Sequence, residues 1–128
     1  MRFLLDTHLL LWLASEPGKL SPAMLDLVGQ PDNELNFSAA SLWEIAIKNA
    51  LKRADFSVDA RRVRAGLLGN GYRELAITGN HTLALEALPA LHKDPFDRIL
   101  IAQAITEDMV LLTADRQLAA YPGPIRPV

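Results

Sequence analysis

Short apolar runs alternate with longer segments of helical periodicity along this chain, and this alternation limits the fold more than any other feature of the sequence. The runs at residues 3–5, 34–38 and 110–112 have the length of buried strands, and helix-length patterns separate them. Strands that are connected through helices return to the same sheet in parallel. The pattern therefore predicts an α/β fold with a mainly parallel central sheet flanked by helices.

One domain is expected to cover residues 1–128, because half of the residues are apolar and the sequence shows no linker, internal repeat or low-complexity segment. A chain of this length buries roughly 65–70% of the surface that its unfolded form exposes. The expected strands are residues 3–5, 34–38, 74–78 and 110–112, with a short edge strand at Ile125. The expected helices are residues 9–14, 41–52, 59–68, 81–87, 95–106 and 116–120, with another that begins at Ser21-Pro22.

The composition excludes several classes of protein. There is no cysteine, which rules out disulfides and thiolate zinc sites, and the three histidines are far apart in the sequence. The longest apolar run, Leu9 to Ala14, is far shorter than the roughly 20 residues that a membrane span requires. Asp6 and His8 interrupt the apolar N-terminal stretch, which is unlike a signal peptide. We expect a cytoplasmic protein that does not enter the membrane.

Two carboxylates follow predicted strands. Asp6 comes directly after residues 3–5, and Asp115 comes shortly after residues 110–112. Ligands of open α/β sheets bind outside the carboxyl ends of the strands, so both acids are candidates for a site. Each also has a structural explanation, because an aspartate in front of a helix can serve as its N-cap.

Two further acids lie near the beginnings of predicted helices. Glu44 stands three residues after Ser41, which is the spacing of a capping box, and four residues before Lys48, which suits an exposed ion pair. Asp97 falls in the first turn of a helix that Asp94 caps, on the same face as apolar residues further along that helix. A charge on an inward face is costly without a partner, and a metal ion would supply one.

In a parallel sheet the carboxyl ends of the strands meet at one edge, so these four acids are expected to lie together. Carboxylates gathered in this way raise one another's pKa unless cations neutralise them. Ligand sets made only of oxygen favour Mg²⁺ or Mn²⁺, which can activate water for attack on a phosphodiester. The catalytic and metal-binding candidates are therefore Asp6, Glu44, Asp97 and Asp115, with Asp94 as an outer assistant.

Basic residues are concentrated in one part of a chain whose net charge is only −2. Six of the 13 lysines and arginines fall between positions 48 and 64, namely Lys48, Lys52, Arg53, Arg61, Arg62 and Arg64. This excess could line a path for phosphates or could simply form solvated helix faces. Lys48 and Arg98 are the candidate phosphate contacts beside the acids.

Taken together, these motifs resemble PIN-domain proteins of the VapC toxin type along essentially the whole chain. The residues that carry the resemblance are Leu4-Leu5-Asp6-Thr7-His8, the run from Ser38 to Lys48, the run from His92 to Arg98, Leu100 to Ala104, and Leu112-Thr113-Ala114-Asp115. By position, Asp6, Glu44 and Asp97 match the family's three acids and Asp115 matches a more variable fourth. Thr7 and Thr113 match hydroxyl positions near the metal.

The resemblance implies a PIN fold and a Mg²⁺- or Mn²⁺-dependent endoribonuclease that acts as the toxin of a type II toxin–antitoxin pair. The partners implied are an RNA substrate, a small VapB-like antitoxin and a second copy of the chain in a homodimer.

Two other functions compete with this one. A phospho-receiver domain needs adjacent acids after its first strand and a lysine after its last, whereas Asp6 stands between leucine and threonine and no lysine follows Lys93. A PIN-like module that only binds RNA or a partner remains the alternative to the enzyme.

Overall fold

The computed structural model describes residues 1–51, 57–90 and 94–128. Within these residues five parallel strands form one sheet in the order β3-β2-β1-β4-β5. The strands are β1 (Arg2–Leu5), β2 (Glu34–Ser38), β3 (Arg73–Leu75), β4 (Val110–Thr113) and β5 (Ile125–Pro127). The predicted parallel α/β sheet is confirmed, and the adjacent central strands β1 and β4 reach their carboxyl ends together, with Leu5 opposite Leu112.

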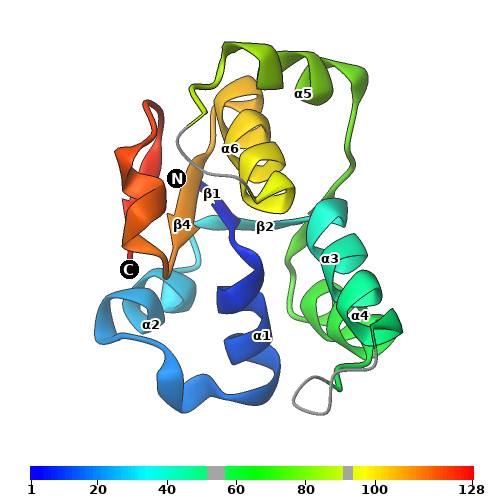
Figure 1. Cartoon of the computed structure of the whole chain (residues 1–128). Coiled ribbons are helices and arrows are strands. Elements are labelled where there is room, and N and C mark those ends of the chain that lie inside the picture. Colours follow the sequence, from blue (N-terminus) through cyan, green and yellow to red (C-terminus); the bar gives the residue numbers. More distant parts are fainter. Residues whose placement is uncertain (52–56, 91–93) are drawn as a thin grey trace.

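Helices cover both faces of this sheet (Figure 1). The helices are α1 (Thr7–Ser15), α2 (Pro22–Gly29), α3 (Ala39–Ala50), α4 (Ala60–Gly69), α5 (Gly79–Ala84) and α6 (Pro95–Glu107). Three short 3₁₀ helices complete the described part of the chain: η1 (Pro17–Lys19), η2 (Leu85–Ala87) and η3 (Arg116–Ala120). None of the helices in the described residues is long and apolar enough to cross a membrane.

The alternation of side chains along β1 divides the core into two layers. Phe3 and Leu5 point to one face of the sheet, where they pack in a cluster with residues of α1, α2 and α4. Leu4 points to the other face and packs with α6 and η3. Because successive strand residues face opposite sides, an unbroken apolar run is what a strand covered on both faces requires.

The direction of α6 decides where Asp97 lies. The helix has 13 residues and is therefore about 20 Å long. After Asp108, whose left-handed backbone (φ 55°) ends the helix, the chain enters the amino end of β4 directly. Since α6 runs antiparallel to the strand that follows it, its first turn lies toward the carboxyl ends of the strands. Asp94 caps that turn as predicted, accepting a hydrogen bond from the backbone of Phe96.

The predicted boundaries of several elements were wrong. The strand expected at residues 74–78 occupies Arg73–Leu75, and the helix expected at residues 81–87 is divided into α5 and η2. The helix expected to begin at Ser41 begins at Ala39, because Ser38 is its N-cap and accepts a hydrogen bond from the backbone of Ala40. Position 52, where this helix was expected to end, lies outside the described residues.

Candidate active site

Asp6 is a buried carboxylate that joins the two central strands at their carboxyl ends. Its side chain is only 3% exposed. Oδ1 accepts a hydrogen bond from the backbone of Leu9 and so caps α1, as the structural explanation of this residue predicted. Oδ2 accepts bonds from the Thr113 hydroxyl at 2.5 Å and from the Ala114 backbone at 2.9 Å. The carboxylate therefore caps a helix with one oxygen and holds the end of β4 with the other.

The electrostatic state of Asp6 follows from this burial. Desolvation raises the pKa of its carboxyl group above the ordinary value, while the hydrogen bonds from Thr113, Leu9 and Ala114 and the nearby His8 lower it less than burial raises it. No lysine or arginine in the described part of the chain forms an ion pair with Asp6. A cation beside Asp6 would favour the ionised form and offset the cost of burial.

Thr113 is fully buried and connects Asp6 with Asp115. Its hydroxyl donates to Asp6 and accepts a hydrogen bond from the Asp115 backbone at 3.0 Å. Asp115 in turn accepts a bond from the backbone of Gln117 with Oδ1, which makes it the N-cap of η3. The predicted caps and the predicted hydroxyl position thus belong to one chain of hydrogen bonds at the end of β4.

A second pair of hydroxyl groups ties α1 to α3. Thr7, the first residue of α1, donates from its hydroxyl to the hydroxyl of Ser41 at 2.9 Å, and both residues are buried. The capping box considered for Ser41 and Glu44 is therefore wrong, since Ser38 caps the helix and Ser41 serves this inter-helix contact. Residue spacing alone did not distinguish the two serines.

Glu44 lies one turn after Ser41 and is buried, with 5% of its surface exposed. It forms the predicted ion pair with Lys48 at 2.8 Å, but the pair is not an exposed one, because the glutamate side chain is 7% accessible and the lysine side chain 33%. Glu44 and Lys48 also line a hollow of about 420 Å³ together with Asp94, Pro95 and Phe96. The hollow therefore lies between α3 and the beginning of α6.

Asp97 lies in the first turn of α6 and is half-buried, with its backbone N–H directed to the carboxylate of Asp94 at 3.3 Å. The rings of Trp43 and Phe96 meet edge to face at 5.0 Å, which fixes α3 against this turn. Asp97 and Glu44 are thus carried by two helices that are in contact where each begins.

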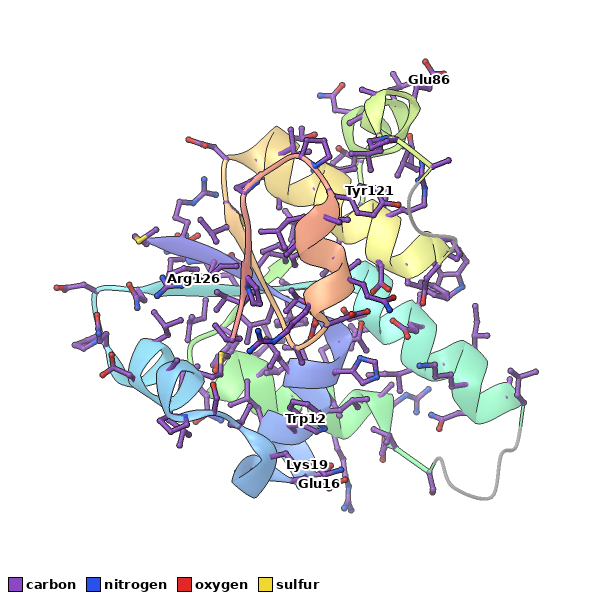
Figure 2. All side chains as sticks on the ribbon, turned by 60° about the vertical axis from the view of Figure 1, so that its left-hand side comes forward. Trp12, Glu16, Lys19, Glu86, Tyr121 and Arg126 are labelled. Carbon is purple, nitrogen blue, oxygen red and sulfur yellow. The ribbon has the colours of Figure 1, made fainter. Side chains whose placement is uncertain are left out.

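Arg98 makes contacts away from these acids. Its guanidinium donates to the carbonyl of Pro89 at 2.9 Å and to the hydroxyl of Tyr121 at 3.2 Å. The side chain of Tyr121 lies over α6 (Figure 2). These contacts connect the residues before α6 with η3, a structural role that its position in the sequence did not reveal.

The basic cluster is only partly described, because Lys52 and Arg53 lie outside the described residues. Arg62 approaches Asp59 at 3.8 Å, and Arg64 bonds to Glu74 at 2.5 Å. The arginines of α4 are exposed and two of them are engaged with acids, which fits the solvated helix face that was the alternative to a phosphate path.

The structure connects Asp6 and Asp115 at the carboxyl ends of the central strands and places Glu44 and Asp97 near the beginnings of α3 and α6, without assembling a finished ligand cage. Among residues 1–51, 57–90 and 94–128, no three carboxylates or imidazoles are grouped so that they could hold a metal ion. The donor chemistry nevertheless fits a hard cation. The candidate ligands are carboxylate oxygens, and the most buried of them, Asp6, has a raised pKa and no ion pair with a lysine or arginine among the described residues.

A parallel five-stranded sheet with acids at the carboxyl ends of its strands defines the class of this protein. Residues 3–124 match the model of the PIN domain family, so the chain belongs to that family.

The relatives of this chain agree with that assignment. The chain is 34% identical over 128 residues to the protein named Ribonuclease VapC22 of Mycobacterium tuberculosis, with 98% of this chain and 95% of that protein covered. Its fold is similar to that in the crystal structure of VapBC2 from Rickettsia felis bound to a DNA fragment from the promoter (TM-score 0.74, 16% identity, 99% of this chain and 98% of that one). It is also similar to VapBC-1 from nontypeable Haemophilus influenzae (TM-score 0.64, 18% identity, the same coverage). At such identities these structures show a shared fold.

Proposed function

We propose that this chain is a metal-dependent endoribonuclease and the toxin of a VapBC-type toxin–antitoxin pair. The observation that carries the proposal is its 34% identity, over nearly the full length of both chains, to a protein named as a VapC ribonuclease. The position of the acids supports it, because Asp6 and Thr113 lie at the carboxyl ends of the central strands, where α/β proteins bind their ligands.

Asp6, Glu44, Asp97 and Asp115 would hold Mg²⁺ or Mn²⁺ in this proposal. When bound, such an ion lowers the pKa of water and neutralises charge that develops on a phosphodiester. The protein's own part is to fix the oxygens. Thr113 and Ala114 orient Oδ2 of Asp6, and the Thr7–Ser41 bond holds α1 against the helix that carries Glu44.

Substrate RNA would contact the rim of this acidic edge. Lys48, whose side chain is one-third exposed, remains a candidate phosphate contact. Arg98 is a weaker candidate, since its guanidinium already bonds to Pro89 and Tyr121. RNA and a small VapB-like antitoxin are the proposed partners in the cytoplasm, and a second copy of the chain is proposed to complete a homodimer.

Cleavage of RNA by purified protein tests this function. Wild type should cut RNA with Mg²⁺ or Mn²⁺, and EDTA should stop the reaction until metal is restored. Asp6→Asn and Asp97→Asn should lose at least about 100-fold in rate, because each removes a charged ligand. Asp26→Asn is the matched control, since Asp26 is an exposed acid on α2.

The outcomes separate the two hypotheses for a PIN domain. RNA binding without cleavage under any metal condition would support the non-catalytic module, and full activity of Asp6→Asn would refute the proposed metal site. Circular dichroism establishes that each variant is folded. Co-expression of the adjacent small gene product should relieve growth arrest if the chain is a toxin.

A further inference from the structure

Lys48 and Glu44 form a charge pair that does not resemble an ordinary pair on a helix surface. The carboxylate is almost completely buried, and its Oε2 bonds to the lysine ammonium at 2.8 Å. The lysine extends from the same helix one turn later, with its side chain one-third exposed. An ionised carboxylate in such a place requires a positive partner, and Lys48 supplies it.

This pairing occupies an acid that the proposed metal site needs. Glu44 is directed to Lys48, and the described residues contain no group of three acids or histidines that could hold a metal ion. A metal ion that recruits Glu44 must therefore change the surroundings of its carboxylate. A divalent cation and an ammonium group next to the same carboxylate repel each other, so the two compete.

Lys48 is the more exposed partner of the pair. Its side chain is 33% exposed and that of Glu44 is 7% exposed, and both line the hollow of about 420 Å³ with Asp94. Glu44 is buried beside the α3–α6 contact. The lysine is therefore the partner that leaves.

We propose that Lys48 is an internal counter-ion, which neutralises Glu44 in the metal-free protein and is displaced when the metal ion binds. It acts as a positioning residue that sets metal affinity. The inference rests on the proposed metal-dependent function and adds to it a cost of metal binding, because the ion must first break the bond between Glu44 and Lys48.

Titration with Mn²⁺ alone, followed by the electron paramagnetic resonance signal of the free ion, tests this role without any measurement of activity. Lys48→Met keeps the length and apolar stem of the side chain but removes the competitor, so Mn²⁺ should bind at least about fivefold more tightly. Lys48→Arg keeps a charge and offers a planar pair of donors to the carboxylate. The affinity of this variant for Mn²⁺ should therefore equal that of wild type or be lower.

Lys19→Met is the matched control. Lys19 pairs with Glu16 at 2.8 Å, also within one helical turn, but both side chains are 56% exposed. Glu16 and Lys19 (Figure 2) follow the C-terminal end of α1, whereas Asp6 caps its N-terminal end. Its removal should leave Mn²⁺ affinity unchanged.

The possible results are distinguishable. Tighter binding by Lys48→Met together with no gain in Lys48→Arg supports the inference. Equal or weaker binding by Lys48→Met, while wild type binds Mn²⁺, refutes the counter-ion role and leaves the proposed function standing. A failure of all these proteins to bind Mn²⁺ refutes both.

Discussion

The Thr113 hydroxyl offers a direct measure of how the protein keeps a buried carboxylate at the end of its sheet. The side chain is fully buried, donates to Asp6 Oδ2 at 2.5 Å and accepts from the Asp115 backbone at 3.0 Å. Thr113→Val has nearly the same shape, so it removes these hydrogen bonds without leaving a cavity. Its effect on the free energy of unfolding therefore reports the hydrogen bonds and not the packing.

The expected loss applies to the pH range in which Asp6 is ionised, because the hydrogen bond from Thr113 favours the ionised form. A hydrogen bond to a charged group contributes about 1.5–3 kcal/mol, and the Asp115 N–H, which lies at a half-buried position, adds up to about 1 kcal/mol when it loses its acceptor. We expect Thr113→Val to lower the free energy of unfolding by about 2–4 kcal/mol. Thr113→Ser keeps the hydroxyl and loses one buried methyl group, which costs about 1 kcal/mol.

The pH dependence makes this prediction specific to Asp6. Burial already raises the pKa of Asp6, and loss of the Thr113 bond, which favours the ionised form, should raise it further. The folded variant should therefore take up a proton at higher pH than wild type. Once the pH has fallen below the Asp6 pKa of both proteins, the carboxyl group of Asp6 is neutral in both. The difference in stability between them should then be smaller by about 1–2 kcal/mol.

Urea unfolding followed by circular dichroism in EDTA, at a series of pH values on both sides of the Asp6 pKa, measures both quantities. The reasoning is refuted if Thr113→Ser is as destabilising as Thr113→Val at the alkaline end of the series. It is also refuted if the penalty for Thr113→Val is the same across the whole series, because the hydroxyl would then not be bonded to an ionisable partner.

Three smaller predictions concern the scaffold and are checked by urea unfolding. Ser38→Ala removes the buried N-cap of α3 and should cost about 1–2 kcal/mol, and an unchanged midpoint would contradict the assigned cap. Hydrogen bonds from Asn36 and an arginine hold the pKa of Glu34 below its ordinary value of 4.5. Glu34 therefore contributes stability at pH values above 4.5, and this contribution is lost as the pH falls through the pKa of the folded protein. Glu34→Gln should therefore cost about 0.5–1 kcal/mol at pH 7 and less in acid, whereas a constant difference would exclude this ionisation. Gly71→Ala should lower the free energy of unfolding by about 1–2 kcal/mol, because the φ of Gly71 is +86°. Gly18→Ala, at an open position without positive φ, should be close to neutral. Equal effects of the two substitutions would refute the backbone strain expected at position 71.

The central strands could be predicted because their sequence patterns are local. The run 34–38 matches β2 in both bounds, since its largely buried residues follow a turn and end at Ser38, the N-cap of α3. The edge strand was less predictable. The expected strand at 74–78 starts one residue earlier and ends three residues earlier in the structure, because pairing with β2, from Asn36 opposite Arg73 onward, determines which residues are in register.

The positions of the candidate site residues in the fold could be predicted from the sequence, whereas the contacts of their side chains could not. Strand ends and helix beginnings placed Asp6 and Asp115 at one edge of a parallel sheet, and hydrogen bonds through Thr113 connect them. The backbone N–H of Ala114, which bonds to Asp6, has no signature in the sequence. The direction of Arg98 toward Pro89 likewise depends on how distant segments pack.

Capping and a role in the proposed site are compatible for Asp6 and Asp115, because a carboxylate has two oxygens. Asp6 caps α1 with Oδ1 and holds the end of β4 with Oδ2. Asp115 caps η3 with Oδ1, and within the described residues its Oδ2 has no hydrogen-bond partner. A cap fixes the orientation of the side chain at the cost of only one acceptor atom. The cap thus positions a second oxygen at the sheet edge, so evidence that such an acid is structural is not evidence against the proposed role in the site.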